Sequence, residues 1–112
     1  MNNVELGKIG EDAATDILVA SGYKILRRNF RCREGEVDII ASRGPMICFV
    51  EVKTRRSMAY GRPCEAVDMT KQKHIRRAAY CYLKEMESKG YVPAKVSFDV
   101  MEVMVQHIKG AF

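Results

Sequence analysis

Three charged residues, Asp38, Glu51 and Lys53, interrupt segments of the chain that are otherwise strongly apolar. Two carboxylates can hold a hard divalent cation, and a lysine beside them can neutralise negative charge that builds on a phosphoryl group. Burying such charges is costly unless a metal ion or a partner compensates them. The residues therefore indicate a metal-dependent phosphodiesterase site. The competing interpretation is a charged strand end at Glu51 and Lys53 with a solvated edge position at Asp38, and spacing alone does not separate the two.

The expected chemistry assigns a role to each side chain. Asp38 and Glu51 would bind Mg²⁺, or Mn²⁺ in its place, and the metal would lower the pKa of a bound water and polarise the phosphoryl oxygen. Lys53 would orient the attacking hydroxide or neutralise the developing charge. Glu11 is a further candidate metal ligand and catalytic residue, because it lies at the edge of the apolar stripe of a predicted helix and can lean toward the sheet. An ordinary solvated glutamate is the alternative at that position.

Two predicted strands would bring the carboxylates together. Side chains two residues apart share one face of a strand, so Glu51 and Lys53 should lie on one side of the strand predicted over 46–53. If the turn before that strand contains an even number of residues, antiparallel register puts Asp38 opposite Glu51, with Cβ atoms about 4.5–5.5 Å apart. The strand that carries Asp38 is expected to alternate, with three apolar residues on its other face, Val37, Ile39 and Ala41.

Hydrophobic periodicity predicts four more elements, which are helices over 4–21 and about 70–89 and strands over 23–31 and 95–106. The stretch 54–63 is polar and basic and predicts a surface loop. The order is helix, three strands, helix, strand, which is typical of an α/β domain whose mixed sheet is flanked by helices. The length predicts a single domain over residues 1–112.

The chain is basic, with 19 Lys and Arg against 14 Asp and Glu and a net charge of +5. Much of this charge brackets the candidate site, at Arg55, Arg56, Arg62, Lys71, Lys73, Arg76 and Arg77. Contacts from such residues to phosphates give sequence-independent affinity, so the expected partner is a nucleic acid. A solvated helix face is the alternative for any one of them. Lys71 and Gln72, at the start of the second helix, are candidates to face the site.

No apolar run approaches the ~20 residues of a membrane-spanning helix, and residues 1–8 lack the apolar core of a signal peptide. We therefore expect a cytoplasmic protein with no membrane partner. The cysteines form no Cys-x-x-Cys pair, and no His stands at zinc-finger spacing. Reduced, buried thiols are favoured over a metal or disulfide role for all four, Cys32, Cys48, Cys64 and Cys81.

Asp38, twelve intervening residues and then Glu51-Val52-Lys53 resemble the catalytic signature of the PD-(D/E)XK nuclease superfamily. Longer segments resemble the YraN family along essentially the whole chain, at Gly7-x-x-Gly10-Glu11 and over 22–26, 29–32, 35–41, 49–55 and 110–112. The resemblance implies a restriction-endonuclease-like fold. It also implies that Asp38 and Glu51 are metal ligands, that Lys53 is the catalytic lysine and that Glu11 is the additional acidic residue of members similar to Holliday-junction resolvases. Val37 departs from the pattern, because the superfamily's name leads one to expect proline there.

These observations together predict a metal-dependent endonuclease that hydrolyses phosphodiester bonds of DNA, either branched or single-stranded. One alternative is a nucleic-acid-binding module that keeps the nuclease fold with little or no cleavage. Another is an RNA-directed nuclease, because the metal chemistry does not require deoxyribose and no 2′-hydroxyl sensor is recognisable. The similarity to resolvases, which cut two strands with two sites, implies a homodimer, although the sequence shows no dimer seam.

Overall fold

The computed structural model describes residues 1–56 and 67–112, and its elements follow the expected order. The two helices and four strands are α1 (Asn3–Ala20), β1 (Lys24–Cys32), β2 (Gly35–Arg43), β3 (Met46–Arg55), α2 (Met69–Ser88) and β4 (Lys95–Met104). The prediction of an α/β protein with the order αβββαβ is therefore confirmed. In the described part of the chain, neither helix is long and apolar enough to cross a membrane.

Both helices begin at side-chain caps. The Asn2 carboxamide oxygen accepts a hydrogen bond from the Glu5 amide at 2.8 Å, and the Asp68 carboxylate accepts one from the Lys71 amide at 2.8 Å. Such caps satisfy backbone N–H groups that have no partner within the helix. At the other end, Gly22 adopts φ +91° just beyond α1, a conformation that glycine reaches without strain. The caps therefore fix the start of each helix beside the sheet.

The sheet is mixed, with strand order β1-β2-β3-β4. β1, β2 and β3 pair antiparallel in sequence, whereas β4 runs parallel beside β3. Gly44 and Pro45 join β2 to β3, and the pair Arg43↔Met46 closes this hairpin. The turn thus contains an even number of residues, which is the condition for Asp38 to approach Glu51.

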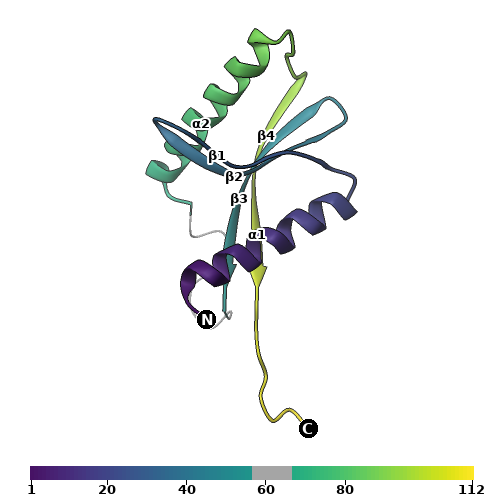
Figure 1. Cartoon of the computed structure of the whole chain (residues 1–112), viewed down its shortest axis with the longest axis vertical. Coiled ribbons are helices and arrows are strands. Elements are labelled where there is room, and N and C mark those ends of the chain that lie inside the picture. Colours follow the sequence, from purple (N-terminus) through teal and green to yellow (C-terminus); the bar gives the residue numbers. More distant parts are fainter. Residues whose placement is uncertain (57–66) are drawn as a thin grey trace.

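The two helices cover opposite faces of the sheet (Figure 1). On the α2 side, Phe49 packs against Tyr82, with ring centroids 6.1 Å apart. On the α1 side, Val50 packs in a cluster with Leu18. Because neighbouring residues of β3 enter different clusters, β3 is buried on both faces, as its apolar sequence predicts. A charged residue in this strand therefore lies close to two hydrophobic layers.

The alternation predicted for β2 is wrong at Asp38. Val37 packs in the α2 cluster, whereas Ile39 packs in the α1 cluster, so two residues expected on one face lie on opposite faces. The ladder between β2 and β3 reaches Ile39↔Val50 and goes no further along β2. On the neighbouring strand β1, Asn29 has φ +51°, a left-handed conformation that asparagine tolerates better than most residues. Asp38 thus lies where the regular pleat is interrupted.

Helix α1 crosses β3 in close contact at Gly10. A Cβ atom at this position would collide with the side chain of Thr54. Only glycine allows such a close approach of the helix backbone, and the next residue, Glu11, is carried toward the sheet as a result. Gly7 differs, because a Cβ there would meet no heavy atom within 4 Å.

Candidate active site

A surface pocket of about 250 Å³ lies where β2 and β3 stop pairing, beside the first turns of α1. Four predicted site residues line it, namely Glu11, Asp38, Glu51 and Lys53. The remaining lining residues come from α1 and β3 and are Asn3, Leu6, Gly7, Val52 and Thr54. The structure therefore brings the whole predicted carboxylate and lysine set to one pocket from three different elements.

Asp38 is held by the backbone of the neighbouring strand. Its Oδ2 accepts a hydrogen bond from the Val52 amide at 2.8 Å. The pairing of β2 and β3 ends at Ile39↔Val50, so this side-chain bond satisfies an amide of β3 beyond the end of their ladder. The carboxylate is thereby fixed beside Glu51, the residue that precedes Val52.

The Asp38 and Glu51 carboxyl groups interact directly. Burial is the main cause that raises the pKa of each group above its usual value, and the Asp38 charge raises the pKa of Glu51 further. Two carboxylates this close and this far from bulk water repel one another, and a cation between them would relieve the repulsion.

Lys71 supplies a positive charge to this pair from the first turn of α2. Its Nζ lies 3.2 Å from Glu51 Oε1, while the Glu51 side chain is only 8% exposed. Burial acts to lower the pKa of Lys71, but Glu51, Asp38 and Glu36 together outweigh it, and the pKa is raised. Lys71 thus contacts a carboxylate of the candidate site.

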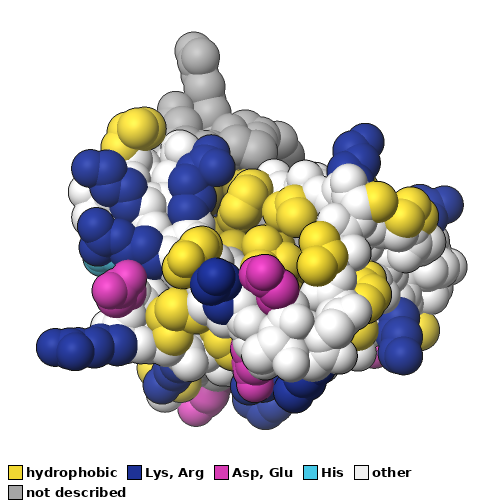
Figure 2. Space-filling view, turned by 90° about the horizontal axis from the view of Figure 1, so that it is seen from above, with side chains coloured by type: hydrophobic (Ala, Val, Ile, Leu, Met, Phe, Trp, Pro, Cys, Tyr) yellow, Lys and Arg dark blue, Asp and Glu magenta, His cyan; other side chains and the backbone are white. Residues whose placement is uncertain are grey.

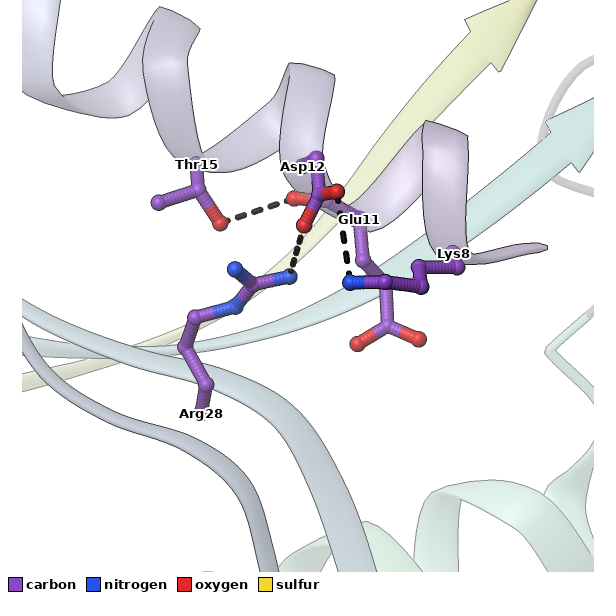
Figure 3. A network of polar contacts seen from close by, with 5 residues as sticks. All are labelled: Lys8, Glu11, Asp12, Thr15 and Arg28. Atoms are coloured by element: carbon purple, nitrogen blue, oxygen red, sulfur yellow. Dashed lines mark hydrogen bonds and ion pairs between the residues drawn. The ribbon is translucent and has the colours of Figure 1, made fainter. Parts of the chain in front are cut away.

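Glu11 reaches the same pocket with one carboxylate oxygen unsatisfied. Its Oε1 is buried and has no hydrogen-bond partner among the described residues. Burial raises the pKa of Glu11, and the Asp38 charge raises it further. In Figure 3 the Glu11 side chain points away from α1, and no dashed line reaches its carboxylate. The neighbouring Asp12 forms ion pairs with Arg28 at 2.8 Å and with Lys8 at 3.4 Å.

The carboxylates fit a hard divalent cation with few protein ligands. Among residues 1–56 and 67–112, no three His, Cys, Asp or Glu side chains are grouped so that they could hold a metal ion. Asp38 and Glu51 form a pair, and Glu11 lines the pocket without completing a three-residue cluster. Mg²⁺ is usually held by one or two carboxylates together with water and substrate phosphate. The buried, unpartnered Glu11 Oε1 is the kind of acceptor that a metal-bound water would satisfy.

The predicted basic residues lie in different surroundings. Arg55 pairs with Glu102 of β4, with Nε and Oε1 2.7 Å apart. Arg56 donates to Asn3 Oδ1 at 3.2 Å and to the Met1 carbonyl at 2.6 Å, so it ties the end of β3 to the start of α1. The other predicted basic residues of α2, Lys73, Arg76 and Arg77, are exposed. Arg62 lies outside the described residues, as does Cys64.

The structure also identifies basic residues near the site that the sequence patterns did not single out. A neighbouring pocket of about 450 Å³ shares Glu11 with the first one and is lined by Lys8, Arg28 and Arg31. The sequence does show a run of arginines in β1, but the alternation of side chains along a strand does not reveal which helix will lie beside them. On the face seen in Figure 2, many basic side chains lie toward the margin, while hydrophobic side chains gather in the middle with basic and acidic side chains among them.

Fold and pocket together define an α/β protein with a carboxylate pair, a lysine and a third acidic residue where the two central strands of a mixed sheet stop pairing. The chain belongs to the Uncharacterised protein family UPF0102, whose pattern it matches over residues 10–103. It is 52% identical over 103 residues to a UPF0102 protein of Caldicellulosiruptor saccharolyticus, covering 92% of this chain and 85% of the relative. It is 46% identical over 105 residues to one of Dictyoglomus thermophilum, covering 94% and 86%. These matches confirm the resemblance to the YraN family as membership of UPF0102.

Proposed function

We propose that this protein is a metal-dependent endonuclease of the PD-(D/E)XK superfamily that hydrolyses phosphodiester bonds of DNA, with branched or single-stranded DNA as its substrate. The observation that carries the proposal is the carboxylate pair of half-buried Asp38 and buried Glu51, which shares one pocket with Lys53 at the end of the β2–β3 ladder. Lys71 pairs with Glu51 and supplies one positive charge for two carboxylates, so the pair remains costly to keep in a fold without a further cation. A catalytic metal site gives it a physical reason.

Asp38 and Glu51 would hold the metal, Mg²⁺ or Mn²⁺, which when bound supplies charge stabilisation at the phosphoryl oxygen and acidifies a water ligand. The Val52 amide orients the Asp38 carboxylate through its hydrogen bond. Lys71 lies against Glu51 and favours the ionised form of that carboxyl group. Lys53 lines the same pocket and would donate hydrogen bonds to the phosphate as negative charge builds on it.

Glu11 is suited to a different role from the pair. Its pKa is raised, and its Oε1 has no hydrogen-bond partner among the described residues. A carboxylate in that state can accept a proton at Oε1 from the attacking water. We therefore assign Glu11 to positioning and deprotonating this water, at the pocket wall opposite β3.

The test incubates the purified protein with linear, flapped and four-way DNA and with RNA, in Mg²⁺, Mn²⁺ or EDTA. We expect cleavage of DNA that requires the metal, and a loss of at least about 100-fold in Asp38→Asn and in Lys53→Met. Both substitutions are close in size to the native residues, so folding can be verified by thermal unfolding. Asp16→Asn, at an exposed position of α1, is the matched control and should cleave as the unmodified protein does.

Three results would contradict the proposal. Cleavage that persists in both Asp38→Asn and Lys53→Met would come from a contaminant. Binding of every substrate without cleavage would identify a binding module. Cleavage of RNA alone would remove DNA as the substrate.

A further inference from the structure

A second pocket, of about 300 Å³, lies on the α2 side of the sheet and shares Glu51 with the first pocket. Its walls come from β3, β4 and the start of α2, and they include Phe49, Phe98, Gln72 and Arg76. Ligand pockets of this kind combine apolar walls with a few placed polar groups, and this volume is at the low end of the ~300–1,000 Å³ range for small-molecule sites. The pocket therefore suits a small planar group beside the carboxylate pair.

Phe98 is the exposed aromatic surface of this pocket. Its ring stacks on the buried ring of Phe49, with centroids 5.5 Å apart and planes inclined by 25°. The Arg76 guanidinium carbon lies 4.9 Å from the centroid of the Phe98 ring. Phe98 nevertheless remains 43% exposed. The ring thus stacks on one aromatic, lies under a guanidinium and is still partly open to solvent, so it is a platform on which another planar group can stack where the flexible Arg76 side chain moves aside.

The platform exists because α2 does not extend fully over the sheet. The helix packs chiefly on β1 and β2, whereas β4 is the last strand of the sheet. The α2-side residues of β4 consequently stay partly exposed, as Phe98, Val100 and Met104 do. Apolar exposure alone would suit many partners. The charged lining is mixed, because Glu51 and Asp99 lie there with Arg76. The pocket therefore favours a planar, uncharged ring whose anionic neighbour is held at Arg76.

We propose that this pocket binds an unpaired nucleobase of the strand whose phosphodiester lies at Asp38 and Glu51. The base would stack on Phe98, and Arg76 would contact the ring or the adjoining phosphate. Bases inside a duplex are already stacked and present only their edges, so Phe98 can be reached only by a single-stranded or locally unpaired nucleotide. This inference rests on the proposed nuclease function and deepens it by selecting the unpaired strand as the substrate class.

The first test uses the absence of tryptophan from the chain. Phe98→Trp introduces a single fluorophore at the platform. Thymidine oligonucleotides added in EDTA should quench its emission, whereas a blunt duplex of the same length should not. Tyr80→Trp is the matched control, because Tyr80 lies on α2 outside the pocket, is 63% exposed and also has a cation, Lys84, near its ring. Equal quenching of the two variants would overturn the proposal.

The second test measures affinity for single strands in EDTA. Phe98→Leu keeps the apolar volume and removes the ring, and we expect the Kd to rise at least about tenfold, the scale of one lost base–aromatic stack. Phe98→Tyr keeps the ring and should restore the affinity. One abasic position in the oligonucleotide should weaken binding to the unmodified protein and have no further effect on Phe98→Leu. Unchanged affinity in Phe98→Leu, or an abasic effect that persists in it, would overturn the proposal.

Failure of the pocket and failure of the nuclease can be told apart. If single strands quench the emission of Phe98→Trp but neither the unmodified protein nor any variant cleaves a substrate, the nucleobase site is supported and the nuclease function is refuted. If DNA is cleaved in a manner that depends on Asp38 while Phe98→Trp is not quenched, the nuclease stands and the nucleobase site falls. If the unmodified protein forms a dimer, Phe98→Leu does not, and neither responds to oligonucleotides, the platform would instead bind a second copy of the chain.

Discussion

Glu51 is a charged side chain held almost out of solvent between an acid and a base. Burial raises its pKa most, Asp38 raises it further, and Lys71, 3.2 Å away, lowers it. Ion pairs buried to this degree do not generally stabilise a fold, because desolvation offsets the attraction. The arrangement is better explained by a carboxyl group whose ionised form is needed when a cation binds. Glu11, with its unpartnered buried oxygen, has the same character.

The Glu11 carboxyl group yields a prediction about stability and pH. Because its pKa is raised in the folded protein, the folded state holds this proton more tightly than the unfolded state, and stability falls as pH rises from the usual carboxyl pKa toward the raised value. Glu11→Gln removes the titration. We expect this variant to be more stable than the unmodified protein at about pH 8, by about 0.5 kcal/mol after allowance for partial exposure, and to lose this advantage near about pH 4.5.

Denaturant unfolding at the two pH values measures the difference. Asp16→Asn, at an exposed position of the same helix, is the control and should not show the trend. An advantage of Glu11→Gln that is larger at the lower pH would reverse the sign and refute the explanation.

At the scale of elements, the crossing of α1 over β3 determines where Glu11 lies. Gly10→Ala would force its Cβ into Thr54, and we expect a loss of about 1–3 kcal/mol in the free energy of unfolding from overpacking. Gly7→Ala is the matched control on the same helix, since its Cβ meets open space and the higher helix propensity of alanine should add up to about 1 kcal/mol. Urea unfolding of the two variants measures the contrast. Equal stability would show that the close crossing does not constrain the helix.

The interrupted pleat of β2 is the second decisive feature at this scale. A regular strand would keep Val37 and Ile39 on one face, whereas the structure places them in the two separate clusters. The interruption frees the Asp38 carboxylate to bond the Val52 amide of the neighbouring strand. The Asp38 carboxylate is thus anchored by backbone, whereas Glu51 contacts the side chain of Lys71.

For the whole molecule, metal binding and folding are linked. A cation that binds the folded pocket and not the unfolded chain stabilises the protein by RT ln(1 + [L]/Kd), about 1.4 kcal/mol at tenfold excess over Kd. For a chain of this size that corresponds to a rise of several degrees in Tm. We expect Mg²⁺ to raise the Tm of the unmodified protein and of Asp16→Asn, and to have little effect on Asp38→Asn and Glu51→Gln. Differential scanning calorimetry provides the measurement, and equal shifts in all four proteins would place the bound cation elsewhere.

Local sequence patterns determined much of this protein. Period-two spacing places Glu51 and Lys53 together, the two-residue turn at Gly44 and Pro45 sets the hairpin register, and apolar periodicity predicts all six elements. These features follow from interactions between residues near in sequence, so they can be read without knowing the fold.

Only the tertiary structure decided how the site is completed. Glu11 reaches the pocket because Gly10 meets Thr54, and Lys71 reaches Glu51 because of where α2 begins on the sheet. Arg55, predicted to lie in a nucleic-acid groove, pairs with Glu102 because β4 runs beside β3. Such contacts join residues far apart in the chain and depend on which faces pack and how closely, and hydrophobic periodicity carries no information about that choice. The sequence by itself thus indicated the chemistry of Asp38, Glu51 and Lys53, while packing decided which side chains surround them.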